Sequence, residues 1–222
     1  DIYQVAWSIS GETGFSRKSD LILKLMEQYP DITREECDIL ISTAFHDQNL
    51  PMGYVFATGA RARDNNEGIV TGAFERMLSW NTPLHISELR EGLTRRFKFR
   101  QLPAVPPLPV LRALIDFLPS FDISDDYVSA TVPLKKDTET VTGWIGTILE
   151  ESPNKTLHKA TIYEEARKAG ENQTSVNVYL QFGEILKSVG RGCASLVGEF
   201  PTPDQIAEVR QQATIANIKE KI

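Results

Sequence analysis

The chain repeats itself, and this repetition constrains its fold more than any other feature of the sequence. "VTGAFERMLSWNTPLH" starts at Val70 and "VTGWIGTILEESPNKTLH" starts at Val141, so Val-Thr-Gly, a later leucine and Leu-His recur in the same order. The offset is 71 residues at the first match and 73 at Leu-His. Loops between elements absorb such small insertions cheaply. A period near 70 residues is longer than that of solenoid repeats and predicts whole small domains in tandem.

Two further matches extend the repeat along the chain. "VLRALIDFLPSFDISDDYVSATV", which starts at Val110, aligns at an offset of 66 with "VNVYLQFGEILKSVGRGCASLVG", which starts at Val176. A fainter copy lies near the N-terminus, where "YVFATG" from Tyr54 resembles "YVSATV" from Tyr127 at an offset of 73. Together these matches predict three copies, each with three helices followed by one or two short strands.

Local patterns in the third copy support this order of elements. "VTGWIGTILEE" places its apolar side chains along one helical stripe, and Ser152-Pro153 ends the helix because the residue before a proline avoids helical geometry. "KATIYEEARKAG" predicts a second helix with Gly170 as its C-cap, and "NQTSVNVYLQF" predicts a third helix with polar N-cap residues. "ILKSVG" and "CASLVG" predict a hairpin around Arg191-Gly192.

Three helices followed by a two-stranded hairpin resemble the winged helix-turn-helix fold. The third copy is similar to winged-helix modules of bacterial transcription and DNA-transaction proteins. The resemblance implies a mainly α fold with small β-hairpin wings, built as three tandem winged-helix domains and a C-terminal helix. In that last helix, Thr202 is expected to be the N-cap and Pro203 the first residue. We place the four parts at residues 1–63, 64–136, 137–200 and 201–222.

The same resemblance implies a nucleic-acid interface, in which a third helix enters the major groove and a wing contacts the backbone. In copy three, the exposed positions of that helix hold side chains able to pair with base edges or phosphates, and the wing holds cations. The middle copy contributes a basic cluster in "LREGLTRRFKFR". The candidate nucleic-acid-binding residues are Arg90, Arg95, Arg96, Lys98, Arg100, Gln173, Thr174, Ser175, Asn177, Gln181, Lys187 and Arg191.

Each candidate also has a structural alternative. The polar face of the third helix is equally consistent with simple solvation. The alternation from Arg96 to Arg100 fits a strand with buried phenylalanines and solvated cations. Acidic residues oppose DNA contact elsewhere, because Asp125 and Asp126 occupy the wing tip of the middle copy. In the first copy the acids assigned to the third helix are Glu35, Glu36, Asp38 and Asp47. We therefore expect the first copy to pack on its neighbours or on a protein partner.

Composition and motifs argue against several other classes of protein. The net charge of -6 disfavours a wholly basic nucleic-acid coat. No apolar run approaches the roughly 20 residues that span a bilayer, and no secretory signal is visible, so we expect no membrane partner and a cytoplasmic location. Cys37, Cys193 and the histidines are scattered, which predicts no metal and no cofactor. "GETGFSRKS" lacks phosphate-loop spacing, and we expect neither enzyme activity nor a small-molecule substrate.

Two functional hypotheses remain. The first is a DNA-binding protein that acts on double-stranded DNA in transcription regulation, DNA transactions or defence. Because the chain begins at Asp1 rather than Met, this hypothesis includes the DNA-binding region of a larger protein. The alternative is a protein–protein adaptor in a multisubunit complex built from winged-helix modules. Its partner would bind domain 1 or the C-terminal helix.

Overall fold

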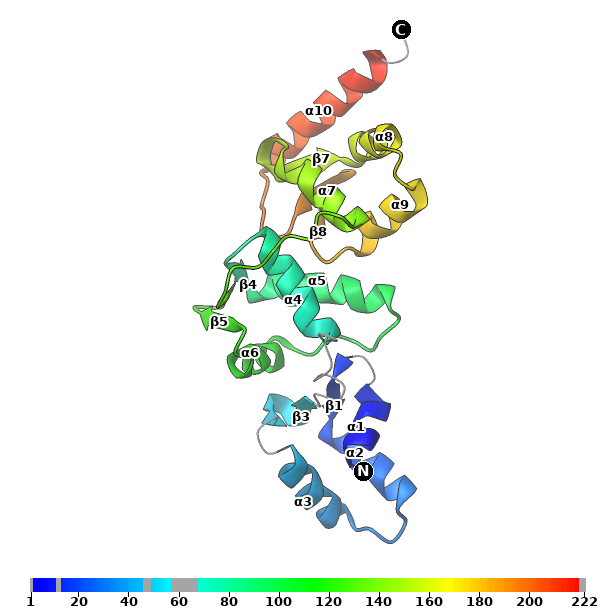
Figure 1. The fold of residues 1–222 in the computed structure, drawn as a ribbon, viewed down its shortest axis with the longest axis vertical. Helices are drawn as coiled ribbons and strands as arrows, with labels where there is room; N and C mark the ends of the chain where they lie inside the picture. The colour runs from blue at the N-terminus through cyan, green and yellow to red at the C-terminus, as the bar shows by residue number, and fades with distance from the viewer. Residues whose placement is uncertain (1, 11–12, 46–48, 57–67, 220–222) are drawn as a thin grey trace. The chain divides into compact units, whose positions relative to one another are not determined.

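The structure is a computed structural model that describes residues 2–10, 13–45, 49–56 and 68–219 of the chain. The described part is mainly helical and contains small antiparallel sheets, as the sequence predicts (Figure 1). Within these ranges no helix combines the length and apolarity that crossing a membrane requires.

The same order of elements occurs three times along the chain. The first copy contains α1 (Ile2–Ser10), β1 (Phe15–Arg17), α2 (Lys18–Gln28), α3 (Arg34–Ala44), β2 (Asn49–Leu50), the 3₁₀ helix η3 (Pro51–Gly53) and β3 (Tyr54–Phe56). The second contains α4 (Ile69–Trp80), β4 (Leu84–His85), α5 (Ile86–Phe99), α6 (Leu108–Phe117), β5 (Phe121–Ser124) and β6 (Tyr127–Ala130). The third contains α7 (Val141–Glu150), η5 (Pro153–Lys155), β7 (Thr156–His158), α8 (Lys159–Ala169), α9 (Gln173–Phe182), β8 (Leu186–Gly190) and β9 (Cys193–Leu196), and α10 (Pro203–Lys219) follows.

Each copy forms a three-stranded sheet whose central strand is the last in sequence, in the orders β1-β3-β2, β4-β6-β5 and β7-β9-β8. The sequence predicts strands only after the third helix, so the strand between the first and second helices is an addition. These first strands, β1, β4 and β7, contain only two or three residues. Such a short segment cannot display the alternation by which a strand is recognised.

Strand register explains why Leu-His recurs. The last residue of each first strand pairs with the first residue of the central strand: Arg17 with Tyr54, His85 with Tyr127, and His158 with Cys193. In the second and third copies this residue is a histidine whose Nδ1 accepts a hydrogen bond from the backbone N–H two residues later. Each histidine therefore ends a strand and caps the next helix. The part of "YVFATG" beyond Phe56 lies outside the described residues.

The glycine of Val-Thr-Gly also has a structural cause in the third copy. A Cβ added to Gly143 would lie 1.8 Å from the carbonyl oxygen of Asp137. The chain that leads into α7 therefore crosses the helix where only glycine leaves room. The same helix begins after Thr140, whose hydroxyl accepts a hydrogen bond from the N–H of Gly143 at 3.2 Å.

Residue contacts divide the chain into two compact units. Unit 1 comprises Asp1–Gly72 and Pro106–Ile123, and unit 2 comprises Ala73–Val105 and Ser124–Ile222. The division passes through α4 and β5, so the middle copy contributes residues to both units. Of the predicted domain boundaries, the one after residue 63 lies outside the described residues, whereas those after residues 136 and 200 fall in the segments that precede α7 and α10.

Unit 1 has its own apolar core, which α1, α2, α3 and β3 enclose. Leu21 and Leu25 of α2 meet Cys37 and Ile41 of α3, at the four-residue spacing that places side chains on one helix face. A capping box holds the start of α3 through Thr33 and the residue three positions later. The predicted third helix of this copy ends at Ala44, and Asp47 lies outside the described residues. Helix α6 lies against β2 and η3 in this unit.

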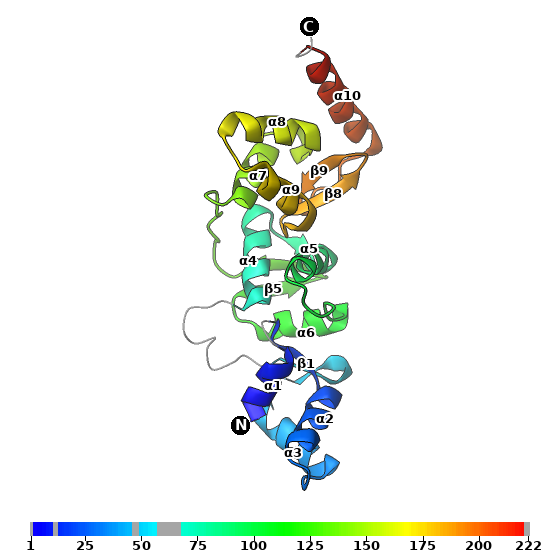
Figure 2. The same cartoon turned by 90° about the vertical axis from the view of Figure 1, so that its right-hand side faces the viewer.

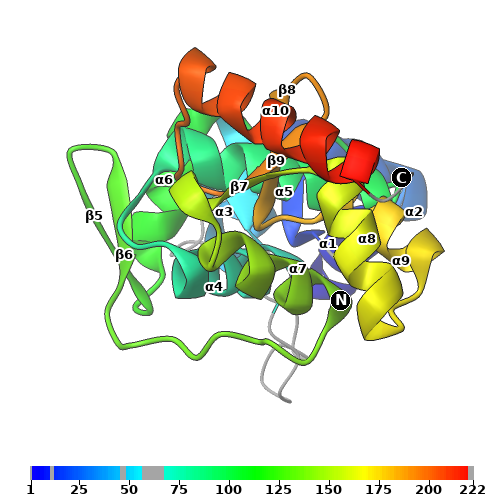
Figure 3. The same ribbon diagram turned by 90° about the horizontal axis from the view of Figure 1, so that it is seen from above.

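Unit 2 contains the whole third copy and α10. Helix α9 lies beside the hairpin of β8 and β9 (Figure 2). Helix α10 lies against β7 and β9 (Figure 3). The helix buries Val209 and Ala213, which are four residues apart and therefore lie on one face. Its start is also as predicted, because Thr202 Oγ1 accepts a hydrogen bond from the N–H of Gln205 at 3.3 Å and Pro203 is the first helical residue.

Candidate nucleic-acid interface

The polar face of α9 is exposed as the sequence predicts. The helix begins after Asn172, whose side-chain oxygen accepts a hydrogen bond from the N–H of Ser175 at 3.0 Å. Val176 and Leu180 are buried, and their spacing directs the opposite face of the helix towards solvent. The predicted contact residues on this face divide into one that is partly buried, Ser175, and four that are exposed, Gln173, Thr174, Asn177 and Gln181.

Helix α8 holds two of these amide side chains. The hydroxyl of Tyr163 donates a hydrogen bond to Asn177 Oδ1 at 2.7 Å, and Gln173 Nε2 donates one to the Tyr163 carbonyl at 3.3 Å. The amide nitrogen of Asn177 retains its donors, and Gln181 lies exposed one turn further along the helix. The exposed face is therefore partly pre-ordered at its N-terminal end.

The turn of the β8–β9 hairpin presents one arginine. Gly190, Arg191 and Gly192 have φ angles of 91°, 50° and 79°, so the turn uses left-handed backbone at three successive residues. Glycine adopts this conformation without strain, which explains the two glycines that flank the arginine. Arg191 is exposed at the tip of the hairpin.

Lys187, the second cation predicted on the wing, has a different environment. Its Nζ lies 3.1 and 3.0 Å from the two carboxylate oxygens of Glu88, and the side chains are only 13% and 7% exposed. Glu88 also accepts a hydrogen bond from the N–H of Gly198 at 3.0 Å. The ammonium lies 3.8 Å from the centre of the Phe200 ring. Lys187 therefore neutralises a buried carboxylate of α5 within unit 2.

The basic cluster of the middle copy lies in α5, so the alternative that these residues form a strand is wrong. Arg95 donates hydrogen bonds to the carbonyl oxygens of Gly183 and Glu184, at 3.2 and 3.1 Å. Gly183 is the C-cap of α9, where backbone carbonyls lack partners within the helix. Burial lowers the pKa of the Arg95 guanidinium, and neighbouring glutamates act in the opposite direction. Arg95 thus holds the end of α9 against α5.

The remaining cations of the cluster differ in exposure. Arg96 lies 5.9 Å from the centre of the Phe99 ring and is partly buried, and burial lowers the pKa of its guanidinium. Arg90 is also partly buried. Lys98 and Arg100 are exposed at the C-terminal end of the helix. Of the predicted cations, the exposed set is therefore Lys98, Arg100 and Arg191.

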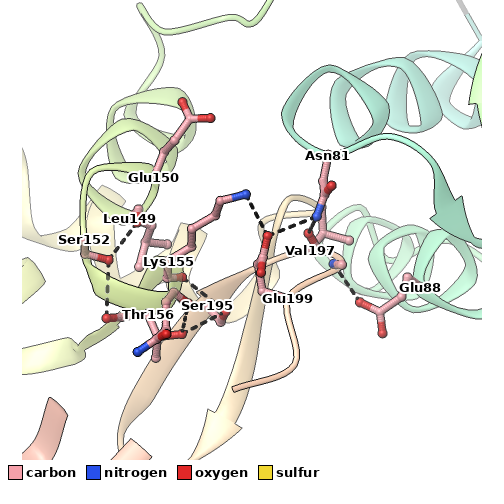
Figure 4. A network of polar contacts seen from close by, with 12 residues as sticks. Asn81, Glu88, Leu149, Glu150, Ser152, Lys155, Thr156, Ser195, Val197 and Glu199 are labelled. Atoms are coloured by element: carbon pink, nitrogen blue, oxygen red, sulfur yellow. Dashed lines mark hydrogen bonds and ion pairs between the residues drawn. The ribbon is translucent and has the colours of Figure 1, made fainter. Parts of the chain in front are cut away.

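The contacts of Lys187 and Arg95 belong to a wider network inside unit 2, where segments of the middle and third copies meet. Figure 4 shows Asn81 donating hydrogen bonds to the carbonyl of Val197 and to Glu199, at 3.1 and 3.3 Å. Lys155 Nζ lies 2.8 Å from the same Glu199 carboxylate. A second buried carboxylate, Glu184, forms an ion pair with Arg76. These contacts set the position of α9 relative to α4 and α5.

This network of polar contacts has no signature in the sequence. Glu88, Glu184 and Asn81 carry no local signal, because each is a common polar residue in a helix or loop whose partners lie far away in the sequence. The related feature of the sequence is the presence of glycines where helices pack closely on neighbouring segments. A Cβ on Gly92 would lie 2.7 Å from the Glu184 carbonyl, and one on Gly146 would lie 2.8 Å from the Trp80 ring.

In the part of the chain that the structure describes, no group of three or more His, Cys, Asp or Glu side chains is arranged to hold a metal ion. Cys37 and Cys193 are buried as free thiols, and burial raises the pKa of each. Comparison with protein-family models, with curated proteins and with solved structures finds no match to this chain.

Proposed function

We propose that this chain is a tandem winged-helix protein that binds duplex DNA through its third copy, in transcription regulation or in other DNA transactions. In this proposal α9 enters the major groove and the β8–β9 hairpin is the wing. The observation that carries the proposal is the exposed polar face of α9 beside a hairpin with Arg191 at its tip. The repeated order of helices and strands, with the last strand central in each sheet, supports the winged-helix assignment.

The side chains on this face suit base recognition. Asn177 and Gln181 are four residues apart, so their side chains project from the same face of α9. Each carboxamide can donate to and accept from one adenine edge in the major groove. Thr174 can bond to a base edge or to a phosphate. Arg191 can then pair with the DNA backbone, as expected for the tip of a wing.

The exposed cations predict a moderate dependence on salt. Lys98, Arg100 and Arg191 are the three exposed members of the predicted basic set. If each engages one phosphate, the slope of log K against log salt concentration is about −2.7. The net charge of -6 works against non-specific attachment. We therefore expect weak non-specific binding and a larger share of the affinity from base contacts.

The test is a selection of preferred duplexes from a random pool, followed by fluorescence anisotropy with the full chain at several salt concentrations. The double variant N177A/Q181A removes both carboxamides from the exposed face. Each bidentate contact contributes about 1–3 kcal/mol, so we expect affinity for the selected duplex to fall by at least about 30-fold. Binding to unselected DNA should change little.

The matched control is Tyr163→Phe, which removes the hydroxyl bonded to Asn177 and leaves the carboxamide in place. This variant should bind the selected duplex within about twofold of the wild type, because the bond lies at an exposed position. Absence of any binding at low salt, or equal affinity of N177A/Q181A and wild type, would refute the proposal. Arg95 is unsuitable for this test, because replacing it disturbs the end of α9 whether or not DNA binds there.

The adaptor hypothesis is a second candidate, and one observation in unit 1 favours it. Large apolar side chains are exposed around one hollow between the end of α2 and α3, among them Tyr29, Ile39 and Leu40. Apolar surface gathered in this way is typical of a site that binds another protein.

A further inference from the structure

Unit 1 contains an open hollow between the end of α2 and one side of α3. Residues 28–32 line it together with Glu36, Ile39 and Leu40. Ile39 is 59% exposed and Leu40 is 47% exposed, although the same helix buries Cys37 and Ile41 completely. Helix α3 therefore has two apolar sides, of which only one is covered by the core of unit 1.

Helix α9 is the equivalent of α3 in the third copy, and an alignment of the two helices identifies the residue that corresponds to Leu40. The N-caps Thr33 of α3 and Asn172 of α9 each accept a hydrogen bond from the N–H three residues later, so the two helices can be aligned from their first residues. This alignment places Leu40 at the position of Tyr179. The same count pairs the buried residues of the two helices: Cys37 with Val176, and Ile41 with Leu180.

In the third copy this side of the helix is covered by the preceding copy. The ring of Phe99, on α5, lies 6.4 Å from the ring of Tyr179 and 6.0 Å from the ring of Phe182, measured between centroids. The covering segment is basic, because Phe99 stands between Lys98 and Arg100. An aromatic side chain flanked by cations therefore covers α9 at the position that Leu40 holds on α3.

In the middle copy the equivalent position of the third helix is also covered. Counted from its N-cap Pro107, α6 has Leu114 there, and Leu114 is fully buried. Helix α6 lies against β2 and η3, which belong to the preceding copy. Within the described part of the chain, the first copy alone leaves this position uncovered, since Leu40 is 47% exposed.

We propose that the hollow beside Leu40 binds a helix of another protein, in which a large apolar or aromatic side chain is flanked by Lys or Arg. The charge of the hollow favours this partner, because the charged residues that line it are the acids Asp31 and Glu36. The backbone N–H and hydroxyl of Thr33 lower the pKa of Glu36, so its carboxylate stays ionised at neutral pH. A basic helix therefore gains both apolar burial and attraction there.

A second copy of this chain does not offer the equivalent helix. Phe99 of α5 already contacts Tyr179 and Phe182, and Arg95 of the same helix already bonds to the end of α9. The proposed partner is thus a different protein. The site lies in unit 1, so its existence does not depend on DNA binding by α9.

The experiment uses a displayed library of helical peptides of 14 residues, the length of α5, randomised at their surface positions. The library is selected against the full chain, and enriched peptides are synthesised and titrated by fluorescence anisotropy. We expect enriched peptides to carry an aromatic or large aliphatic residue with neighbouring Lys or Arg. The double variant I39Q/L40Q should weaken their binding by at least about tenfold, as expected for loss of central apolar anchors.

The matched control is Leu23→Gln, which removes an exposed leucine of α2 outside the lining of the hollow and should leave peptide affinity within about twofold. Circular dichroism checks that all variants remain folded, which is expected because each replaced side chain is exposed. The proposal fails if no peptide is enriched, if enriched peptides are acidic, or if they bind I39Q/L40Q as well as wild type. Self-association of the chain that I39Q/L40Q abolishes would assign the hollow to a second copy and would also overturn the proposal.

Discussion

The pair formed by Glu88 and Lys187 permits a direct measurement of what holds unit 2 together. Lys187→Met removes the ammonium and keeps most of the side-chain volume. The Glu88 carboxylate, 7% exposed, then remains buried, and among the residues that the structure describes its remaining hydrogen-bond partner is the N–H of Gly198. Breaking a buried ion pair from one side costs about 3–5 kcal/mol. Because the Gly198 bond persists, we expect a loss near the lower limit, about 3 kcal/mol.

The reciprocal variant and the double variant complete a thermodynamic cycle. Glu88→Gln keeps an oxygen that can accept from Gly198 but leaves the Lys187 ammonium without a counter-charge, so we expect a loss of about 2 kcal/mol. In E88Q/K187M neither charge remains, and the loss should be only about 2–3 kcal/mol. The sum of the single losses then exceeds the double loss by about 2–3 kcal/mol, which measures the coupling of the two side chains.

The assay is urea unfolding followed by circular dichroism, with an unchanged m-value as the check on the unfolding model. In a thermal scan the single Lys187→Met change should lower the Tm by about 6–12 °C, at about 2–4 °C per kcal/mol. If Lys187 were instead a solvated residue whose role is to contact DNA phosphates, its replacement would change the free energy of unfolding by no more than about 0.5 kcal/mol. A stability change that small, or strict additivity of the two single variants, would refute the structural role of the pair.

Three further changes test other parts of unit 2. Gly143→Ala should destabilise the protein by about 1–2 kcal/mol in urea unfolding, because the clash with the Asp137 carbonyl outweighs the helix propensity of alanine, whereas Thr142→Ala should have little effect. Burial and nearby cations lower the pKa of His158 in the folded protein. The neutral imidazole therefore stabilises the fold fully above the unfolded pKa near 6.5, and this stabilisation is lost as pH falls through the lower folded value. The variant His158→Asn, which keeps a helix cap without a titrating group, should reduce the loss of Tm between pH 7.5 and pH 5. Arg95→Lys should cost about 1–2 kcal/mol, because lysine cannot reproduce the two-carbonyl contact of the guanidinium, and an unchanged urea midpoint would contradict that contact.

Several features of the fold could be predicted from the sequence because they depend on near neighbours. The helices of the third copy follow from apolar spacing and from caps such as Asn172 and Gly170, both of which act as predicted. The offset of 73 residues between His85 and His158 corresponds to equivalent strand positions. The first strand of each copy was not predictable in this way, because two or three residues carry no period.

The candidate interface shows the same division between local and distant causes. The exposure of Asn177 and Gln181 follows from helix geometry once Val176 and Leu180 are assigned to the core. The roles of the cations do not follow from any local pattern. Lys187 and Arg191 are four residues apart in one hairpin, yet the first is buried in an ion pair and the second is exposed.

Three copies of one pattern of elements, the polar face of α9 and the acidic residues of α3 can be inferred from the residue pattern. Which charged groups remain available to a partner follows only from how the elements pack. The physical reason is distance along the chain, because Glu88 and Lys187 are 99 residues apart and meet only after the copies pack together. Helical and strand periods express interactions over a few residues, whereas the pairing of a charge depends on every element that folding brings beside it.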